Sequence, residues 1–318
     1  MQLHGLHHVT AVSARIGVNY DFYTRVMGMR LVKKTVNQDD VTAYHLFYAD
    51  KVGSPGTDMT FFDWPQTGAD QRGTDSIVTT SFRVNGRAAL DYWAERLHEQ
   101  EVSHEGVQTI DGREVLRFDD PEGQRLLLVD DGNAPYEGEI WDGSDVPAEH
   151  AIRGFYAITL SVPDIQMTNA ILTQVLNFKA VRSTKDTDGA EMLIYEMDGG
   201  GPGREVWVRV EPNLRRAWPG AGSVHHAAFR VTDFEEQQKW RKQITSVGLP
   251  ASEFIDRYYF RSIYFRISNG ILFEIATDGP GFTADEQLET LGEELALPPF
   301  LEPKRAAIEA GLKPIVTP

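Results

Sequence analysis

The chain has 318 residues, 41% of them hydrophobic and 25% charged, which is the composition of a globular protein long enough for two ordinary domains. Its formal net charge of −16 lacks the basic footprint of a nucleic-acid-binding protein, and no apolar run approaches the roughly 20 residues that span a membrane. The absence of cysteine excludes disulfides, thiolate metal ligands and a cysteine nucleophile. No secretory leader is recognisable at the N-terminus, so we expect a cytoplasmic protein.

A pattern of one strand, one helix and then further strands recurs four times along the chain. The first copy predicts a strand, a helix ended by Gly28 and three strands, at 6–12, 18–27, 31–35, 44–49 and 59–63. The second copy predicts a strand, a helix and only two strands, at 77–84, 88–99, 114–118 and 125–129. These repeats indicate duplication of one supersecondary unit of about seventy residues.

The third and fourth copies show the full pattern. The third predicts a strand, a helix with Asp164 as N-cap and three strands, at 156–162, 164–176, 179–182, 191–197 and 205–211. The fourth predicts elements at 224–231, 234–247, 254–257, 262–267 and 272–277. The glycine run at 199–203 joins two predicted strands and is expected to form a hairpin loop.

The segment 133–147, rich in Gly, Asp, Pro and Glu, is the best linker candidate. We therefore expect a first domain at 1–135 with the first two copies and a second at 150–282 with the last two. The remaining residues, 283–318, hold one helical stretch and a proline-rich turn. They are expected to pack on the core as a C-terminal extension.

Two histidine pairs open equivalent strands, His7-His8 in the first copy and His225-His226 in the fourth. Because successive side chains of a strand point to opposite faces, the two members of a pair cannot easily serve one site equally. His225 alternates with a plainly apolar set, whereas His226 lies on the more polar face of its strand. The second histidine of each pair, His8 and His226, is therefore the better candidate for a ligand.

A third candidate ligand, Glu274, interrupts the oily strand 271–276 and points away from its most apolar face. A buried carboxylate must be paired, hydrogen-bonded or bound to a metal. Two histidines and one carboxylate form the open ligand set of non-haem Fe(II) oxygenases, although zinc accepts the same ligands. If Thr60-Phe61-Phe62-Asp63 is aligned with 271–274, Asp63 becomes a candidate fourth ligand. Its other interpretation is a strand-end residue before a turn.

The other histidines carry weaker signals. His98 falls in a predicted helix, while His104 and His150 fall in polar connections, where solvated roles are expected. His45 lies in a predicted strand and could face a cavity, but its spacing supports no role. No nucleophile motif of the Gly-x-Ser-x-Gly kind is present.

The repeat and its ligand positions resemble the vicinal oxygen chelate superfamily, and within it the ring-cleaving dioxygenases that act on hydroquinones. The similar segments span nearly the whole chain: 5–10, 31–37, 224–229, 270–278 and 297–303. The resemblance implies an α+β fold of four βαβββ modules that form two incomplete mixed β-barrels. Since the third-copy strand at 155–159 has no histidine, the metal site would join modules 1 and 4. A homo-oligomer is compatible with the family.

The same resemblance assigns His8, His226 and Glu274 as ligands of one Fe(II) ion, with zinc, manganese or nickel conceivable in a purified sample. It also implies roles beside the metal for five further residues: His7, Thr10, His225, Arg257 and Tyr264. Strand alternation independently turns Tyr264 away from the apolar face that Ile263 and Phe265 share.

The reaction expected from this resemblance is Fe(II)-dependent extradiol-type cleavage of an aromatic diol by O2. One rival is a glyoxalase-like isomerase or lyase that uses zinc, nickel or manganese, with Asp63 as fourth ligand. A second rival is a metal-free small-molecule-binding protein of the resistance type. The hydroquinone or catechol that fits is not specified by the sequence.

Overall fold

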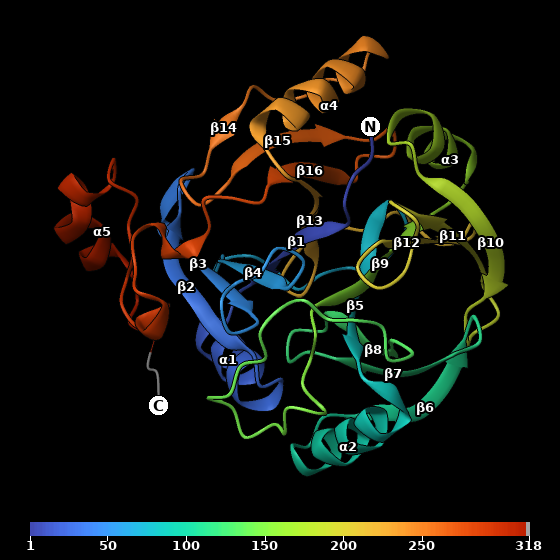
Figure 1. Cartoon of the computed structure of the whole chain (residues 1–318), viewed down its shortest axis with the longest axis horizontal. Coiled ribbons are helices and arrows are strands. Elements are labelled where there is room, and N and C mark those ends of the chain that lie inside the picture. The colour runs from blue at the N-terminus through green and yellow to red at the C-terminus, as the bar shows by residue number, and fades with distance from the viewer. Residues whose placement is uncertain (316–318) are drawn as a thin grey trace.

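The computed structural model describes residues 1–315 and contains two eight-stranded mixed β-sheets with few helices. Figure 1 shows the sheets curling side by side, the first in blue and orange and the second in green and yellow. Each curled sheet leaves its barrel incomplete. This arrangement confirms the predicted α+β fold of paired βαβββ modules.

The first sheet joins modules 1 and 4 in the strand order β14-β15-β16-β13-β1-β4-β3-β2. Its strands are β1 (Leu6–Ser13), β2 (Arg30–Asn37), β3 (Asp40–Ala49), β4 (Asp58–Asp63), β13 (Val224–Val231), β14 (Ile255–Asp256), β15 (Arg261–Arg266) and β16 (Leu272–Thr277). The central strands β1 and β13 pair antiparallel, and each pairs in parallel with the last strand of its own module.

The second sheet joins modules 2 and 3 in the matching order β10-β11-β12-β9-β5-β8-β7-β6. Its strands are β5 (Ser76–Val84), β6 (His104–Ile110), β7 (Arg113–Asp119), β8 (Arg125–Asp130), β9 (Phe155–Val162), β10 (Lys179–Lys185), β11 (Glu191–Glu196) and β12 (Glu205–Val210). The expected boundary at 133–147 thus lies between two modules of one sheet. It separates the halves of the sequence and does not separate the two sheets.

Helices cover the outer faces of the sheets. They are α1 (Ile16–Asp21), α2 (Gly86–Glu99), α3 (Gln166–Ala170), α4 (Phe234–Ser246) and α5 (Arg305–Gly311), while π-helical turns follow α1 at Phe22–Val26 and α3 at Ile171–Val175. The third helix begins later than predicted, because Ile165 is its N-cap; the Asp164 carboxylate accepts from Gln166 N–H at 2.7 Å. Trp93 and Trp240 anchor α2 and α4 in the main core.

The strand β6 is absent from the sequence prediction, and His104 begins it instead of lying in a connection. Most of its residues are only half-buried or exposed, and it forms an edge of its sheet, so it carries little apolar signal. His150 also departs from a solvated role, because its ring stacks on Tyr92 with centroids 4.6 Å apart.

The described part of the C-terminal extension contacts β2, the edge strand of the first sheet. The buried Lys33 ammonium donates to Asp285 Oδ1 at 2.7 Å and to the carbonyl of Phe282, the residue just before the extension, at 3.1 Å. The Arg30 guanidinium donates to the Leu288 carbonyl at 2.7 Å. The last residues of the predicted extension, 316–318, lie outside the described residues. No helix within residues 1–315 has both the length and the apolar character needed to cross a membrane.

Candidate metal centre and substrate pocket

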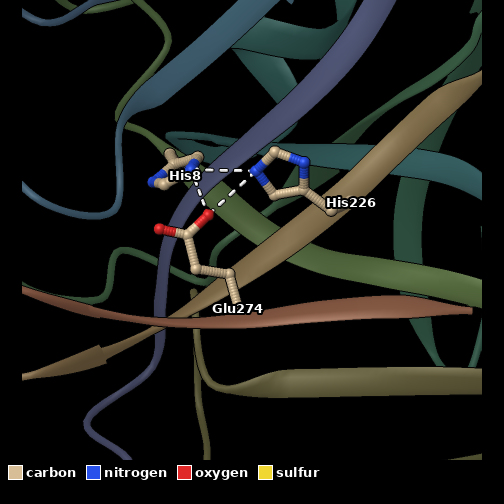
Figure 2. A group of neighbouring side chains, drawn as sticks. All are labelled: His8, His226 and Glu274. Carbon is tan, nitrogen blue, oxygen red and sulfur yellow. Dashed lines mark hydrogen bonds and ion pairs between the residues drawn. The ribbon is translucent and has the colours of Figure 1, made fainter. Parts of the chain in front are cut away.

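Three adjacent strands of the first sheet bring the predicted ligands together: His8 from β1, His226 from β13 and Glu274 from β16. His8 and Glu274 both lie opposite Ala228, because β13 runs between β1 and β16. Ala228 is fully buried, and its single methyl group leaves the space between the two ligands open. Figure 2 shows the two imidazoles and the carboxylate pointing toward one another.

The three donor atoms form a nearly equilateral triangle. Glu274 Oε2 lies 2.9 Å from His226 Nε2 and 3.2 Å from His8 Nε2, and the two Nε2 atoms are 3.3 Å apart. Ligands at right angles on one ion, with bonds of about 2.1 Å, lie about 3 Å apart. The donor set therefore fits three neighbouring positions of an octahedral metal ion. Among residues 1–315, no other His, Cys, Asp or Glu joins this group.

The charge states of the cluster suit metal binding. Burial alone would raise the pKa of Glu274, but the neighbouring His8 and His226 outweigh burial and hold that pKa well below its usual range. Burial lowers the pKa of His226, and the nearby carboxylate only partly offsets this shift. At neutral pH the site therefore presents an ionised carboxylate and a neutral His226, which are the protonation states that bind a metal ion.

The first histidine of each pair sits behind the ligand and contacts its other ring nitrogen. His7 Nδ1 lies 2.9 Å from His8 Nδ1, and His225 Nδ1 lies 2.7 Å from His226 Nδ1. If Nε2 of each ligand faces the metal without a proton, Nδ1 carries the proton and donates it to the neighbouring histidine. Such a partner fixes the tautomer and the orientation of a ligand ring. The structure thus places His7 and His225 against the ligands, outside the pocket that the ligands face.

Ser262 on β15 is a neighbour of the cluster that sequence reasoning missed. Its hydroxyl donates to Glu274 Oε1, which leaves Oε2 directed at the two histidines. Ser262 alternates with Tyr264, so the parity that selected Tyr264 also places Ser262 on the same face of the strand. A serine is too common in strands for this signal to stand out without the position of Glu274 on the neighbouring strand.

The sheet register corrects the alignment that made Asp63 the counterpart of Glu274. Glu274 lies opposite Ala228, two residues beyond His226, and the residue opposite Thr10, two beyond His8, is Thr60. Asp63 lies three residues further on, opposite Ser13 at the end of β4. The shared phenylalanines of the two strands had suggested the wrong register. Asp63 stands apart from the metal cluster, and burial raises its pKa to about 6.

A pocket lies on the open side of the cluster. His8, His226, Arg257 and Tyr264 line it, whereas Thr10 is engaged behind it by a 2.8 Å hydrogen bond between its hydroxyl and that of Thr60. Eight further residues complete the wall, none of them singled out from the sequence as functional: Thr35, Asn37, Gln38, His45, Phe47, Phe62, Tyr259 and Phe260. The pocket is therefore mostly aromatic, with polar groups from both modules.

His45 is the polar group that sequence reasoning set aside. Its ring lies between Phe47 and Phe62, with centroids 4.1 and 4.5 Å away, and its Nε2 is 2.9 Å from the Thr60 hydroxyl. Burial is the main cause that lowers its pKa well below the usual value, so the ring is neutral at physiological pH. Only the pairing of β3 with β4 shows that His45 faces the pocket.

Comparison with known proteins agrees with this geometry. Residues 5–128 and 154–278 match the model of the glyoxalase/bleomycin resistance protein/dioxygenase superfamily. MhqA of Bacillus subtilis, named as a ring-cleaving dioxygenase, is 45% identical over 99% of this chain and 100% of its own length. The chlorohydroquinone/hydroquinone 1,2-dioxygenase of Sphingobium indicum is 32% identical over 95% of this chain and 93% of its own.

Solved structures also resemble this chain. A crystal structure described as a dioxygenase of Bacillus subtilis superposes with a TM-score of 0.91 at 37% identity, over 99% of this chain and 98% of that one. Glyoxalase I of Zea mays shares the fold alone, with a TM-score of 0.63 at 12% identity over 86% of this chain and 92% of that one. The chain therefore belongs to the glyoxalase/bleomycin resistance protein/dioxygenase superfamily, and within it to the enzymes of the ring-cleaving dioxygenase family.

Proposed function

We propose that the protein is an Fe(II)-dependent extradiol-type dioxygenase that opens the ring of a hydroquinone. The observation that carries the proposal is the triangle of His8 Nε2, His226 Nε2 and Glu274 Oε2, which occupies one side of an ion and faces a pocket. Three protein ligands leave further coordination positions free, the arrangement of non-haem Fe(II) oxygenases. When bound, Fe(II) would supply positions at which a substrate oxygen and O2 are held side by side, together with the electron exchange between them.

The overall reaction balances without another reductant. Both atoms of O2 enter the product, the carbon–carbon bond beside one hydroxylated carbon breaks, and a carboxylic acid and an aldehyde form. The diol supplies the electrons that reduce the oxygen. No nicotinamide or flavin is required.

The residues of the pocket can orient such a ring and stabilise charge on it. The aromatic walls formed by Phe47, Phe62 and Phe260 exclude water and pack against a flat substrate. Arg257 and Tyr264 present cationic and neutral donors to an oxygen that becomes negative during the reaction. The pKa of Tyr264 is raised, first by burial and then by the charge of Glu274, so its hydroxyl remains a proton donor at neutral pH.

A hydroquinone, whose hydroxyls lie at opposite ends of the ring, can place only one of them at the metal. The second hydroxyl needs a partner across the pocket, and His45, Asn37 and Gln38 offer polar groups on the module 1 side. A catechol, with adjacent hydroxyls, has no such need. The name of the Sphingobium indicum relative supports the same choice of substrate class.

The isomerase alternative would need a fourth ligand, a carboxylate at the module 1 counterpart of Glu274, and the residue found there disfavours it. Thr60 lies there, and its hydroxyl is engaged by Thr10 and His45.

The test of the proposal is anaerobic reconstitution with Fe(II), followed by oxygen uptake across matched hydroquinones and catechols. We expect uptake with hydroquinones, equimolar with the diol consumed. Turnover of the diol under strict anaerobiosis would contradict the proposal.

A further inference from the structure

The pocket is bordered by turns from both edges of the incomplete barrel, and we call this border the pocket mouth. β14 and β2 are the outermost strands of the first sheet. The β2–β3 turn contributes Asn37 and Gln38 to the pocket, and the turn that follows β14 contributes Arg257, Tyr259 and Phe260. A substrate bound in this pocket is therefore bordered by one turn from module 1 and one from module 4.

An ion pair joins these two turns. Arg257 Nη1 donates to Asp39 Oδ1 at 3.1 Å and Arg257 Nη2 to Asp39 Oδ2 at 2.8 Å, so the contact is bidentate. Gln38 Nε2, one residue before Asp39, donates to the Arg257 carbonyl at 2.8 Å. The module 1 turn thus holds both the side chain and the backbone of Arg257, across 218 residues of sequence.

The two partners differ in their surroundings. The Asp39 side chain is 71% exposed and that of Arg257 is 16% exposed. The Asn37 side-chain oxygen accepts from the Asp39 amide at 2.9 Å, which fixes the turn that carries the carboxylate. Because one partner is exposed to water, the ion pair contributes little to the stability of the fold.

The geometry of the guanidinium leaves donors for a substrate. Arginine has five N–H groups; Asp39 takes one from each Nη, and Nε points to the Tyr264 hydroxyl at 3.4 Å. One N–H on each Nη remains. The Arg257 backbone is held at Phe260, whose carbonyl accepts from its amide at 2.9 Å. Within residues 1–315 the hydrogen-bond partners of the charged end are therefore Asp39 and Tyr264.

We propose that Asp39 is a positioning residue that holds Arg257 across the pocket mouth and closes the mouth behind the aromatic diol. This inference rests on the proposed function for its substrate, but the contact itself belongs to the chain. With Asp39 in place, the Arg257 guanidinium lies over the pocket with its free N–H groups available to a substrate oxygen. Without Asp39 the long side chain samples other rotamers, and the bond from the Gln38 amide to the Arg257 carbonyl remains to join the two turns.

The first test compares Asp39→Asn with Asp40→Asn in the Fe(II)-loaded enzyme. Asp40 is the matched control, because the hydrogen bonds of its carboxylate within residues 1–315 go to the nearby Thr42 in the same strand. We expect D39N to lower kcat/KM for hydroquinone by about tenfold, chiefly through kcat, with iron content and thermal midpoint unchanged. D40N should stay within about twofold of the parent, and Asp39→Glu should recover part of the loss.

The decisive comparison repeats D39N in an Arg257→Gln background. If Asp39 acts through Arg257, D39N costs less than about twofold there, because its partner is already gone. An equal loss in both backgrounds would overturn the proposal, as would a D39N enzyme with parental kinetics.

A readout without turnover separates this proposal from the proposed function. Hydrogen–deuterium exchange of the amides at 36–39 and 257–260, a window that leaves out the Thr42 amide bonded to Asp40, should accelerate in D39N and not in D40N, whatever the substrate. Unchanged exchange in D39N would contradict the proposal that Asp39 holds Arg257 in place. If exchange is faster in D39N but the parent enzyme consumes no oxygen with any diol, the role of Asp39 in holding Arg257 stands and the proposed reaction is rejected.

Discussion

The two sheets share one topology and differ in what fills their inner faces. The central pairing sets His8 opposite Ala228 and Thr10 opposite His226 in the first sheet, and Thr79 opposite Thr159 and Ser81 opposite Ala157 in the second. On this register the counterparts of the ligands His8, His226 and Glu274 are Thr79, Ala157 and Trp207. The second sheet therefore has the same strand framework with none of the candidate ligands at the equivalent positions.

The second inner face is a packed core closed by ion pairs. Trp207 and Tyr156 stand where the first sheet has Glu274 and His225, with ring centroids 6.0 Å apart. At the same end Arg182 pairs with Glu205, which is 1% exposed, at 3.0 Å. The first sheet thus carries the polar cluster and the pocket on its inner face, whereas the inner face of the second sheet is an apolar core. The comparison shows that both sheets have a strand register in which three side chains could meet around a metal ion. The identity of those three side chains decides whether such a site can form.

The strongest challenge to this comparison is Glu274→Ala. We expect loss of bound iron and a fall in oxygen uptake of about a thousandfold or more, since two histidines alone hold the ion poorly. Metal analysis and an oxygen electrode measure both effects. The matched control is Glu205→Ala, which removes an equally buried carboxylate from the second sheet and should retain iron. Full oxygen consumption by E274A would refute the ligand assignment.

Trp207→Ala is the reciprocal change, in the sheet without ligands. It empties a buried indole site and leaves Glu205 without the 2.6 Å hydrogen bond from the indole N–H. The free energy of unfolding should fall by about 3–5 kcal/mol, measured by chemical denaturation. Iron per chain should remain at the parental value. If the Trp207→Ala variant also lost its iron, the two sheets would not have separate roles.

Thr60→Glu tests whether the fourth position matters for chemistry. A carboxylate at the counterpart of Glu274 would compete for a coordination position that the substrate or O2 requires. We expect retained metal and a loss of oxygen uptake of about ten- to a hundredfold, with Thr60→Ser close to the parent. Metal content and uptake are measured on the same sample. An unaffected rate in T60E would mean that this position does not face the open side of the ion.

Acid should destabilise the metal-free protein through the histidines behind the ligands. Burial, followed by the neighbouring ligand histidine, lowers the pKa of both His7 and His225 to about 3. Between about pH 6.5 and 3 the unfolded chain binds protons that the folded chain does not, so stability is lost as the pH falls. The expected slope is about 1.4 kcal/mol per pH unit for each histidine.

Denaturation curves of the protein, freed of metal with a chelator and recorded at several pH values, measure this slope. His7→Gln and His225→Gln should each reduce it, whatever their effect on stability at neutral pH. The second sheet has Val78 and Tyr156 at the equivalent positions, so this source of acid sensitivity lies in the first sheet. Slopes that remain at the parental value in both variants would disprove this origin.

Strand alternation and the repeat were enough to select His8, His226 and Glu274 and to pair module 1 with module 4. Alternation needs only local sequence, and two like pairs in equivalent strands made the pattern visible. Thr60, Ser262 and His45 could not be found in this way, because their importance depends on cross-strand register. Local sequence leaves a register uncertain by a few residues, and the three-residue error at Asp63 shows the consequence.

The remaining differences have equally physical causes. The apolar spacing at 18–27 predicted one helix, where the structure has α1 followed by a π-helical turn. Both hydrogen-bond patterns present similar faces, so sequence periodicity does not distinguish them. The Asp39–Arg257 contact joins two turns at opposite sheet edges, and nothing local marks either residue. Contacts across the gap of a curled sheet become visible only when its curvature is known.

The most direct test of the account is an anomalous diffraction map at the iron edge, from crystals of the anaerobically Fe(II)-loaded protein. We predict one peak per chain, about 2.0–2.2 Å from His8 Nε2, His226 Nε2 and Glu274 Oε2, and none on the inner face of the second sheet. Coordination by a fourth protein side chain, or a peak away from these three atoms, would contradict it.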